Sequence, residues 1–286
     1  MKIHPIKTGT VRIHERQRRG EGHGITRAVR TLFDRTWTEP LPIYAWLIEH
    51  PEGLIVVDTG ETARTAAPDY FPRWHPFYRY AVRPEVRPDE EIGLQLLDIG
   101  VRPEDVRWVV LTHLHTDHAG GLHHFPRSEI LVSRTEYRAA RGFAGRLRGY
   151  LPHRWPRWFA PRLIELSGAP VGPFPHSFAV TDAQDVRVVP TPGHTTGHCS
   201  VVVLDGDRMV FLAGDTTYSE DLLVQRALDG VCSMGGGEAA ALESIDRVLT
   251  LARQSEVIYL PSHDPDAARR LADSLEEGPV AETHSR

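Results

Sequence analysis

Short apolar runs separated by turn residues recur along the chain and predict a protein with many buried strands. Such runs favour strands when they are about four to eight residues long and rich in β-branched or aromatic side chains. The runs of this kind are 43–48, 54–57, 106–111, 186–189, 199–204, 209–212 and 257–260. Gly53 and Gly206 predict turns between neighbouring runs, at 51–53 and 205–206.

Other segments have the spacing of amphipathic helices, with apolar side chains at every third or fourth position. The helices expected in this way cover 89–99, 133–148, 238–253 and the residues from Asp264 onward. Gly100 ends the first of them. Ser133 and Glu136 have the spacing of a capping box, so we expect Glu136 to cap the second.

Strands that alternate with helices favour a mixed α/β (α+β) fold, and the 286 residues are enough to bury a full core. The segments 61–88 and 149–176 are rich in proline and aromatic residues and are expected to be long loops. We expect a single domain over 1–286, with an N-terminal extension (1–42), a core (about 43–275) and a frayed tail (276–286).

Composition and charge limit the binding partners and the cellular compartment that can be expected for this protein. The formal net charge of -5 gives no general reason to expect a nucleic-acid partner. No apolar run approaches the roughly 20 residues that cross a bilayer, and residues 1–5 lack the apolar stretch of a secretory signal. Cys199 and Cys232 do not make a disulfide framework, and Cys199 is expected to be a small core residue. A cytoplasmic protein without a membrane partner is therefore expected.

The chemistry is concentrated in the sequence His113-x-His115-x-Asp117-His118, which directly follows a predicted strand. Imidazole and carboxylate ligands suit zinc, iron, cobalt or manganese, and the absence of thiolate argues against a purely structural zinc. Four ligand-type side chains within six residues are too many for one tetrahedral metal that keeps an open position. The cluster therefore predicts two metal ions.

Further candidate ligands stand at the ends of other predicted strands. Asp58, His194, Asp215 and His263 each follow an apolar run, as His113 does. Strands whose ends meet at one edge of a sheet can bring such distant residues together. We therefore expect one site at which these side chains converge.

The histidine cluster resembles the signature of the metallo-β-lactamase-fold hydrolases. Other landmarks of that family follow in the same order: 57–60 (Val-Asp-Thr-Gly), 191–198 (Thr-Pro-Gly-His-Thr-x-Gly-His), 212–215 (Leu-Ala-Gly-Asp) and 262–264 (Ser-His-Asp). The resemblance implies an αββα sandwich with a dinuclear metal site at one edge of two facing sheets. Zinc is the first choice of metal, with iron, cobalt or manganese as alternatives.

The resemblance also implies a role for each candidate ligand. His113, His115 and His194 would hold the first metal ion, Asp117, His118 and His263 the second, and Asp215 would bridge both. Asp58 would accept a proton from a ligand imidazole. Because this ligand set is complete, we expect structural or supporting roles for His123, His124 and His198.

Tyr218, three residues after Asp215, resembles the tyrosine of the N-acyl-homoserine lactonase (quorum-quenching) branch of the family. The resemblance implies that a metal-bridging hydroxide opens the ring of a small-molecule lactone. Tyr218 would contact the lactone carbonyl, and Asp117 would carry a proton to the leaving alkoxide. Thr116 departs from the family's cluster and could change the pocket floor. A homodimer is compatible with this assignment.

An acyl chain would need an apolar channel, for which nine aromatic residues are candidates: Phe33, Trp37, Phe71, Trp74, Phe77, Tyr78, Trp155, Trp158 and Phe159. The Arg-rich segment 134–162 would most simply be a solvated face.

Other functions stay open at this point. A hydrolase of the same fold could act on a different lactone, a thioester, a phosphodiester or a β-lactam. A metal-binding redox or regulatory protein is the alternative from another class. The related flavodi-iron proteins, however, carry a glutamate where this chain has His115.

Overall fold

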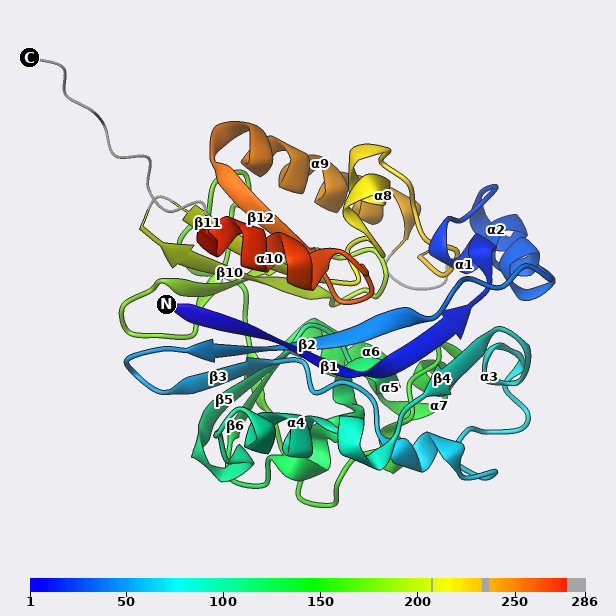
Figure 1. The fold of residues 1–286 in the computed structure, drawn as a ribbon. Helices are drawn as coiled ribbons and strands as arrows, with labels where there is room; N and C mark the ends of the chain where they lie inside the picture. Colours follow the sequence, from blue (N-terminus) through cyan, green and yellow to red (C-terminus); the bar gives the residue numbers. More distant parts are fainter. Residues whose placement is uncertain (207, 233–236, 277–286) are drawn as a thin grey trace, which may run out of the picture.

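Two β-sheets face each other, and helices cover both outer faces (Figure 1). The computed structural model describes residues 1–206, 208–232 and 237–276. The larger sheet has the order β4 (Val82–Glu85), β1 (Lys2–Ile13), β2 (Leu41–Glu49), β3 (Leu54–Val57), β5 (Val106–Leu111), β6 (Glu129–Ser133) and β7 (Arg162–Ile164). The smaller sheet has the order β12 (Glu256–Pro261), β11 (Arg208–Gly214), β10 (Cys199–Asp205), β9 (Val186–Pro190) and β8 (Phe178–Ala179).

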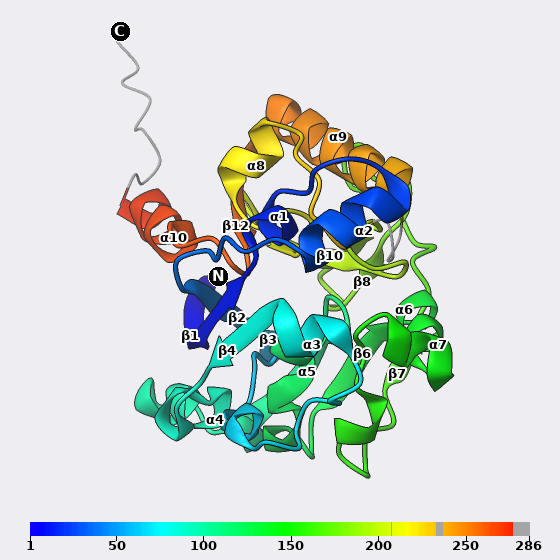
Figure 2. The ribbon, with the colours of Figure 1, turned by 90° about the vertical axis from the view of Figure 1, so that its right-hand side faces the viewer.

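The helices of the described chain lie around these sheets, and Figure 2 shows α1 and α2 on the same side as α8 and α9. The α-helices are α1 (Glu15–Arg18), α2 (Gly24–Leu32), α3 (Pro76–Tyr80), α4 (Ile92–Asp98), α5 (Thr116–Ala119), α6 (Arg134–Ala140), α7 (Gly142–Leu147), α8 (Glu220–Val224), α9 (Glu238–Gln254) and α10 (Ala267–Glu276). Short 3-10 turns are η1 (Ala63–Ala66), η2 (Pro88–Glu90), η3 (Pro103–Asp105), η4 (Gly120–His124) and η5 (Pro152–Arg154).

Apolar packing divides the protein into layers. The central core lies between the sheets, where Trp46 and Val110 of one sheet share a cluster with Val201 and Leu212 of the other. A second cluster packs α4 under the larger sheet, and a third packs α9 over the smaller one. These layers confirm the expected αββα sandwich.

Strand direction explains why the predicted ligands meet. β3 and β5 are parallel in one sheet, and β11 and β12 are parallel in the other. β9 is antiparallel to β10, which is antiparallel to β11, so β9 and β11 run the same way. The backbone N–H of Cys199 donates to the carbonyl of Thr112 at 3.0 Å and joins the two sheets at this end.

The prediction of an N-terminal extension over 1–42 is wrong, because residues 2–13 form β1 inside the larger sheet, between β2 and β4. Pro5 and Gly9 interrupt the apolar pattern of this segment and make it a poor strand by sequence. Gly9 has a φ of 106° and lies where the register to β2 shifts, between Lys7 and Thr10. The core therefore begins at residue 2 rather than at 43.

The single helix expected over 133–148 is also wrong, since α6 and α7 are separated at Arg141. The capping box does not form: Ser133 makes no side-chain cap, and Glu136 is fully buried.

The two expected loops contain ordered elements, namely η1, α3 and β4 in 61–88, and η5 and β7 in 149–176. β6 and β8 were not expected. The expected frayed tail falls almost wholly on 277–286, outside the described residues.

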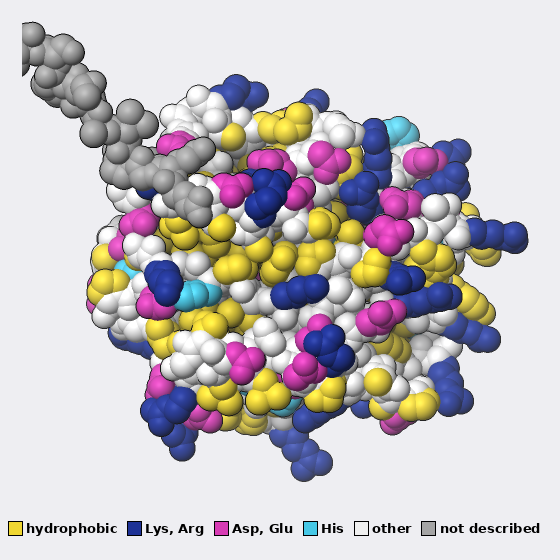
Figure 3. Space-filling view, in the orientation of Figure 1, with side chains coloured by type: hydrophobic (Ala, Val, Ile, Leu, Met, Phe, Trp, Pro, Cys, Tyr) yellow, Lys and Arg dark blue, Asp and Glu magenta, His cyan; other side chains and the backbone are white. Residues whose placement is uncertain are grey.

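Acidic and basic side chains are interspersed on the face shown in Figure 3. In the part of the chain that the structure describes, no helix combines the length and apolar composition that a membrane span requires.

Candidate metal centre

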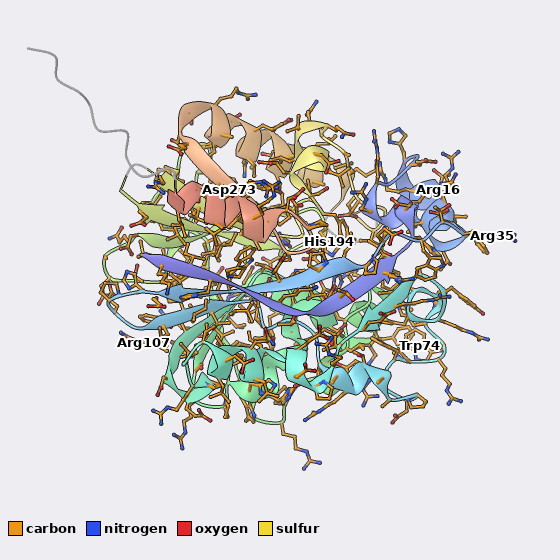
Figure 4. The ribbon with its side chains drawn as sticks, in the orientation of Figure 1. Arg16, Arg35, Trp74, Arg107, His194 and Asp273 are labelled. Atoms are coloured by element: carbon orange, nitrogen blue, oxygen red, sulfur yellow. The ribbon has the colours of Figure 1, made fainter. Side chains whose placement is uncertain are left out.

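The predicted ligands converge where four strands end. His113 and His115 follow β5, His194 follows β9, Asp215 follows β11 and His263 follows β12. Asp117 and His118 lie on α5, in the same loop as the first pair. Figure 4 shows His194 in the interior of the protein, while Arg107 and Arg35 lie at its outside.

One half of the group consists of three imidazole nitrogens. Nδ1 of His115 lies 3.1 Å from Nε2 of His113 and 3.0 Å from Nε2 of His194. Oδ2 of Asp215 lies 3.4 Å from the same His194 nitrogen. The three histidine nitrogens are close enough to bind one metal ion together.

The other half faces the second oxygen of Asp215. Its Oδ1 lies 3.2 Å from Nε2 of His118 and 3.4 Å from Nε2 of His263. Oδ2 of Asp117 completes this half, at 3.4 Å from the same His263 nitrogen. Asp215 therefore presents one oxygen to each half of the group.

Each histidine of the group has an oxygen atom near the ring nitrogen that points away from the centre. The pairs are His113 Nδ1 with Thr112 Oγ1 (3.1 Å), His115 Nε2 with Arg148 O (3.4 Å), His118 Nδ1 with Asp58 Oδ2 (2.8 Å), His194 Nδ1 with Asp229 Oδ2 (3.0 Å) and His263 Nδ1 with Pro42 O (2.9 Å). Carbonyl and carboxylate oxygens only accept, so the outward nitrogen carries a proton. The inward nitrogen can then offer a lone pair to a metal ion.

Asp58 supports two histidines at once. Its Oδ2 accepts from His118, as expected, and also from the Thr112 hydroxyl at 2.9 Å. Since Thr112 uses its proton on Asp58, its oxygen is left to accept from His113. Asp58 has a φ of 60°, a strained value for a residue other than glycine, at a position where these buried hydrogen bonds hold it.

Three buried atoms of the group have no hydrogen-bond partner among the described residues: His118 Nε2, His263 Nε2 and Asp215 Oδ1. An unsatisfied buried polar atom costs about 1–3 kcal/mol, so several of them together require an explanation. A divalent cation would accept electron pairs from all three. The donor set therefore fits a metal centre.

The charges at the centre also favour a cation. Burial alone would lower the pKa of His263, but the carboxylates of Asp215 and Asp117 outweigh it and raise that pKa to about 10. The same competition raises the pKa of His118 well above its ordinary value. Burial lowers the pKa of His115 to about 4, so its ring is neutral at pH 7. The carboxylates thus stabilise positive charge, whether of a proton or of a metal ion.

Glu136 is a site residue that the sequence pattern misplaced. Its carboxylate accepts hydrogen bonds from Leu114 N (3.0 Å), Tyr150 Oη (2.9 Å), Thr195 Oγ1 (2.7 Å) and Gly197 N (3.2 Å). Leu114 lies between His113 and His115, and Thr195 follows His194. Glu136 therefore ties together the two loops that carry the first half of the group.

Two further acidic residues were missed. Asp229, in the segment after α8, accepts from His194, and no pattern in the sequence marks this position. Glu61 is buried and lines the cavity beside Thr116. Burial first, and then the charge of Asp117, raises the pKa of Glu61 to about 8. The position of Glu61 directly after the 57–60 landmark was the one signal that could have found it.

His123, His124 and His198 lie outside the ligand group. Nε2 of His198 accepts from the backbone N–H of Asp215 at 3.0 Å, which fits the supporting role expected for it. His123 and His124 both pair with Glu91, at 3.1 and 2.7 Å. Cys199 is a buried core residue, as expected.

A cavity that is partly open to solvent connects the ligand group to an apolar wall. The wall is formed by Val11, Ile13, Phe71, Phe77, Tyr78, Val82, Pro84 and Leu147. Tyr218 lies at the polar end, where its ring stacks on that of His263 with centroids 5.3 Å apart. Thr116 lines the cavity as well.

Three of the nine candidate channel aromatics line this cavity: Phe71, Phe77 and Tyr78. The others do not. Trp155 and Phe159 pack against the core under the larger sheet, and Phe33 is 75% exposed. The Arg-rich segment 134–162 contributes Arg148 to the cavity, and Arg134 pairs with Glu165 at the surface.

Comparison with known proteins identifies the class to which this fold and site belong. Residues 38–263 match the sequence model of the metallo-beta-lactamase superfamily. The chain belongs to the metallo-beta-lactamase superfamily, as the histidine cluster indicated.

Curated relatives include a probable metallo-hydrolase of Mycobacterium tuberculosis, 32% identical over 244 residues (80% of this chain and 76% of the relative). The N-acyl homoserine lactonase AttM of Azorhizobium caulinodans is 31% identical over 233 residues, which cover 79% of this chain and 83% of the relative. An N-acyl homoserine lactonase of Bacillus cereus is 28% identical over 231 residues, covering 78% and 82%.

Solved structures share the fold. An N-acyl homoserine lactone hydrolase with the product N-hexanoyl-L-homoserine at its catalytic metal centre superposes with a TM-score of 0.73, at 23% identity, over 94% of this chain and 95% of the other. The dizinc quorum-quenching lactonase AidC gives a TM-score of 0.63 at 17% identity, over 92% and 87%.

Proposed function

We propose that this protein opens the ring of N-acyl-homoserine lactones with the help of two divalent metal ions, most simply zinc. The observation that carries the proposal is the cavity, which joins the His/Asp group and Tyr218 to an apolar wall of eight residues. A polar lactone ring fits the first part and an acyl chain the second. Curated relatives named N-acyl homoserine lactonases support the same substrate class.

The proposed ligands would divide between two ions, and the short distances among their ligand atoms support this division. His113, His115 and His194 would hold one ion, and Asp117, His118 and His263 would hold the other, with Asp215 between them. Two such ions lower the pKa of water and polarise a carbonyl oxygen.

Residues of the chain would supply the remaining chemistry. The Tyr218 hydroxyl would donate a hydrogen bond to the lactone carbonyl oxygen, on which negative charge develops. Attack by water forms a bond to the carbonyl carbon, and the ring C–O bond breaks. Asp117 would carry one proton of the water to the leaving ring oxygen, which becomes the alcohol of the product. The second proton leaves with ionisation of the new carboxylic acid.

An assay panel tests this function. Metal-loaded protein would be given N-acyl-homoserine lactones, γ-lactones without an amide, thioesters, phosphodiesters and a cephalosporin at matched concentrations. We expect the highest kcat/KM for the N-acyl-homoserine lactones, together with two metal ions per chain by elemental analysis. A higher kcat/KM for another class would reassign the substrate, and no turnover by the loaded protein would favour a redox or regulatory role. The quorum-quenching role, cytoplasmic location and homodimer stay predictions.

A further inference from the structure

The side chain of Gln17 lies in the same cavity as the metal-ligand group. It comes from α1, in the segment that the sequence pattern treated as an extension, and it is 4% exposed. Its Nε2 donates to the hydroxyl oxygen of Tyr218 at 3.2 Å. Since this contact uses Tyr218 as an acceptor, the phenolic proton is left for another partner.

The other end of the Gln17 amide is unsatisfied. Oε1 is buried and accepts no hydrogen bond from any residue that the structure describes. An amide oxygen left in this way is less stable than one that accepts from a donor. Buried orphan atoms are rare in native proteins, and one on a side chain that lines the cavity beside Tyr218 is explained if a ligand supplies the donor.

The backbone holds Gln17 at a fixed place relative to the metal-ligand group. Gly230 donates its N–H to the carbonyl of Gln17 at 2.7 Å, and Gln17 donates its own N–H to His14 at 2.8 Å. A Cβ atom on Gly230 would come within 2.9 Å of the Gln17 Cα atom, so the two segments are in close contact. Asp229, the neighbour of Gly230, accepts from His194. The amide is thus tied to the same segment that orients a candidate ligand.

The chemistry of an N-acyl lactone matches this arrangement. Its amide nitrogen is bonded to the ring carbon next to the lactone carbonyl carbon. The N–H donor and the carbonyl oxygen are therefore attached to adjacent carbon atoms. On the protein, Tyr218 and Oε1 of Gln17 are likewise neighbours, one offering a proton and the other an acceptor.

We propose that Gln17 is a specificity-determining residue whose Oε1 accepts a hydrogen bond from the amide N–H of N-acyl lactones, while Nε2 orients Tyr218. This inference rests on the proposed function. A lactone without an N–H group would leave Oε1 of Gln17 buried without a donor. Such a loss discriminates strongly between substrates, so Gln17 would select for N-acyl lactones.

The test compares N-hexanoyl-homoserine lactone with the analogue in which an ester oxygen replaces the amide N–H. The ratio of kcat/KM for the two compounds is measured in the metal-loaded wild type and in Gln17→Met. We expect the wild type to favour the amide by about tenfold to a hundredfold, and Gln17→Met to bring the ratio close to one. The ratio does not depend on the fraction of protein that is folded or loaded with metal.

Two further variants control the comparison. Gln17→Glu keeps an acceptor but cannot donate to Tyr218, so it should slow both substrates and retain a preference for the amide. Gln225→Met makes the same replacement at an exposed position and should leave the ratio unchanged. A wild-type ratio near one, or an unchanged ratio in Gln17→Met, overturns the inference and leaves lactone hydrolysis standing.

If the metal-loaded wild type opens neither compound, the proposed function fails. The inference about Gln17 is then tested by measuring how tightly the protein binds the two ring-opened products. Titration calorimetry with the ring-opened products of both compounds requires no turnover. The inference holds if Gln17→Met weakens binding of the amide product alone. It is overturned if the variant binds both products as the wild type does.

Discussion

Nδ1 of His194 lies 3.0 Å from Oδ2 of Asp229, although 35 positions separate the two residues. The other oxygen of Asp229 accepts from the backbone N–H groups of Val231 and Cys232, at 2.7 and 2.6 Å, so the carboxylate is fixed in place. An acceptor held at Nδ1 keeps the proton there and leaves Nε2 of His194 to bind metal.

Removal of this acceptor should weaken metal binding. We expect Asp229→Ala to lower the affinity for zinc by about tenfold to a hundredfold, because His194 loses the partner that fixes its tautomer and orientation. Competition with a chromogenic chelator measures the affinity. Asp185→Ala is a matched control, since Asp185 pairs with His50 away from the site. Equal affinities in the two variants would show that Asp229 does not support the metal.

Loss of a candidate ligand should remove metal and activity together. Asp215→Ala is expected to affect both ions, since its two oxygens face the two halves of the group. His113→Ala should reduce the metal content and abolish turnover. Elemental analysis of the purified variants gives ions per chain, and His176→Ala, at an exposed position, should retain the wild-type content. Two ions per chain and normal turnover in either ligand variant would refute the assignment.

The hydroxyl of Tyr218 should matter for the rate and not for metal binding. We expect Tyr218→Phe to lower kcat for a lactone by about tenfold to a hundredfold, as for the loss of a donor to a developing oxyanion. Metal content should stay at the wild-type value, because the ring still packs on His263. Tyr137→Phe, which removes a hydroxyl under the larger sheet, should not change kcat. An unchanged kcat in Tyr218→Phe would remove the hydroxyl from the mechanism.

The candidate ligands could be predicted because each is marked by local sequence. His113 to His118 stand together, and Asp215 and His263 each follow a strand whose apolar run is easily recognised. Parallel strands then bring these ends to one place, which is a property of the fold and not of any single residue. The layers could be predicted for the same reason, since β5 and β9 are buried along most of their length.

The residues that support the ligands could not be found in this way. β1 alternates buried and exposed positions around Pro5 and Gly9, and its place between β2 and β4 depends on pairing with distant strands. Gln17 and Asp229 acquire their roles through contacts over 201 and 35 positions. An acidic residue on a short helix normally faces solvent, and the local spacing of Ser133 and Glu136 predicts a helix cap. Tertiary packing instead buries Glu136.

Burial of Glu136 also predicts how the stability of the protein depends on pH. Burial raises the pKa of this carboxyl above its ordinary value of 4.5, although hydrogen bonds from Thr195 and Leu114 oppose the shift. The unfolded chain therefore releases this proton at a lower pH than the native protein, and the native state loses stability from Glu136 as the pH rises from about 4.5 through the raised pKa.

Glu136→Gln removes this titration. The variant should be less stable than the wild type at low pH, because its amide cannot accept all four hydrogen bonds. As the pH rises through the same window, the difference in unfolding free energy between the two proteins should narrow, since only the wild type carries an ionising group at this position. Urea unfolding from pH 4 to pH 8 measures the difference. Glu243→Gln, at an exposed position, should follow the wild type in parallel. A parallel curve for Glu136→Gln would mean that Glu136 is as easily ionised in the folded protein as in the unfolded chain.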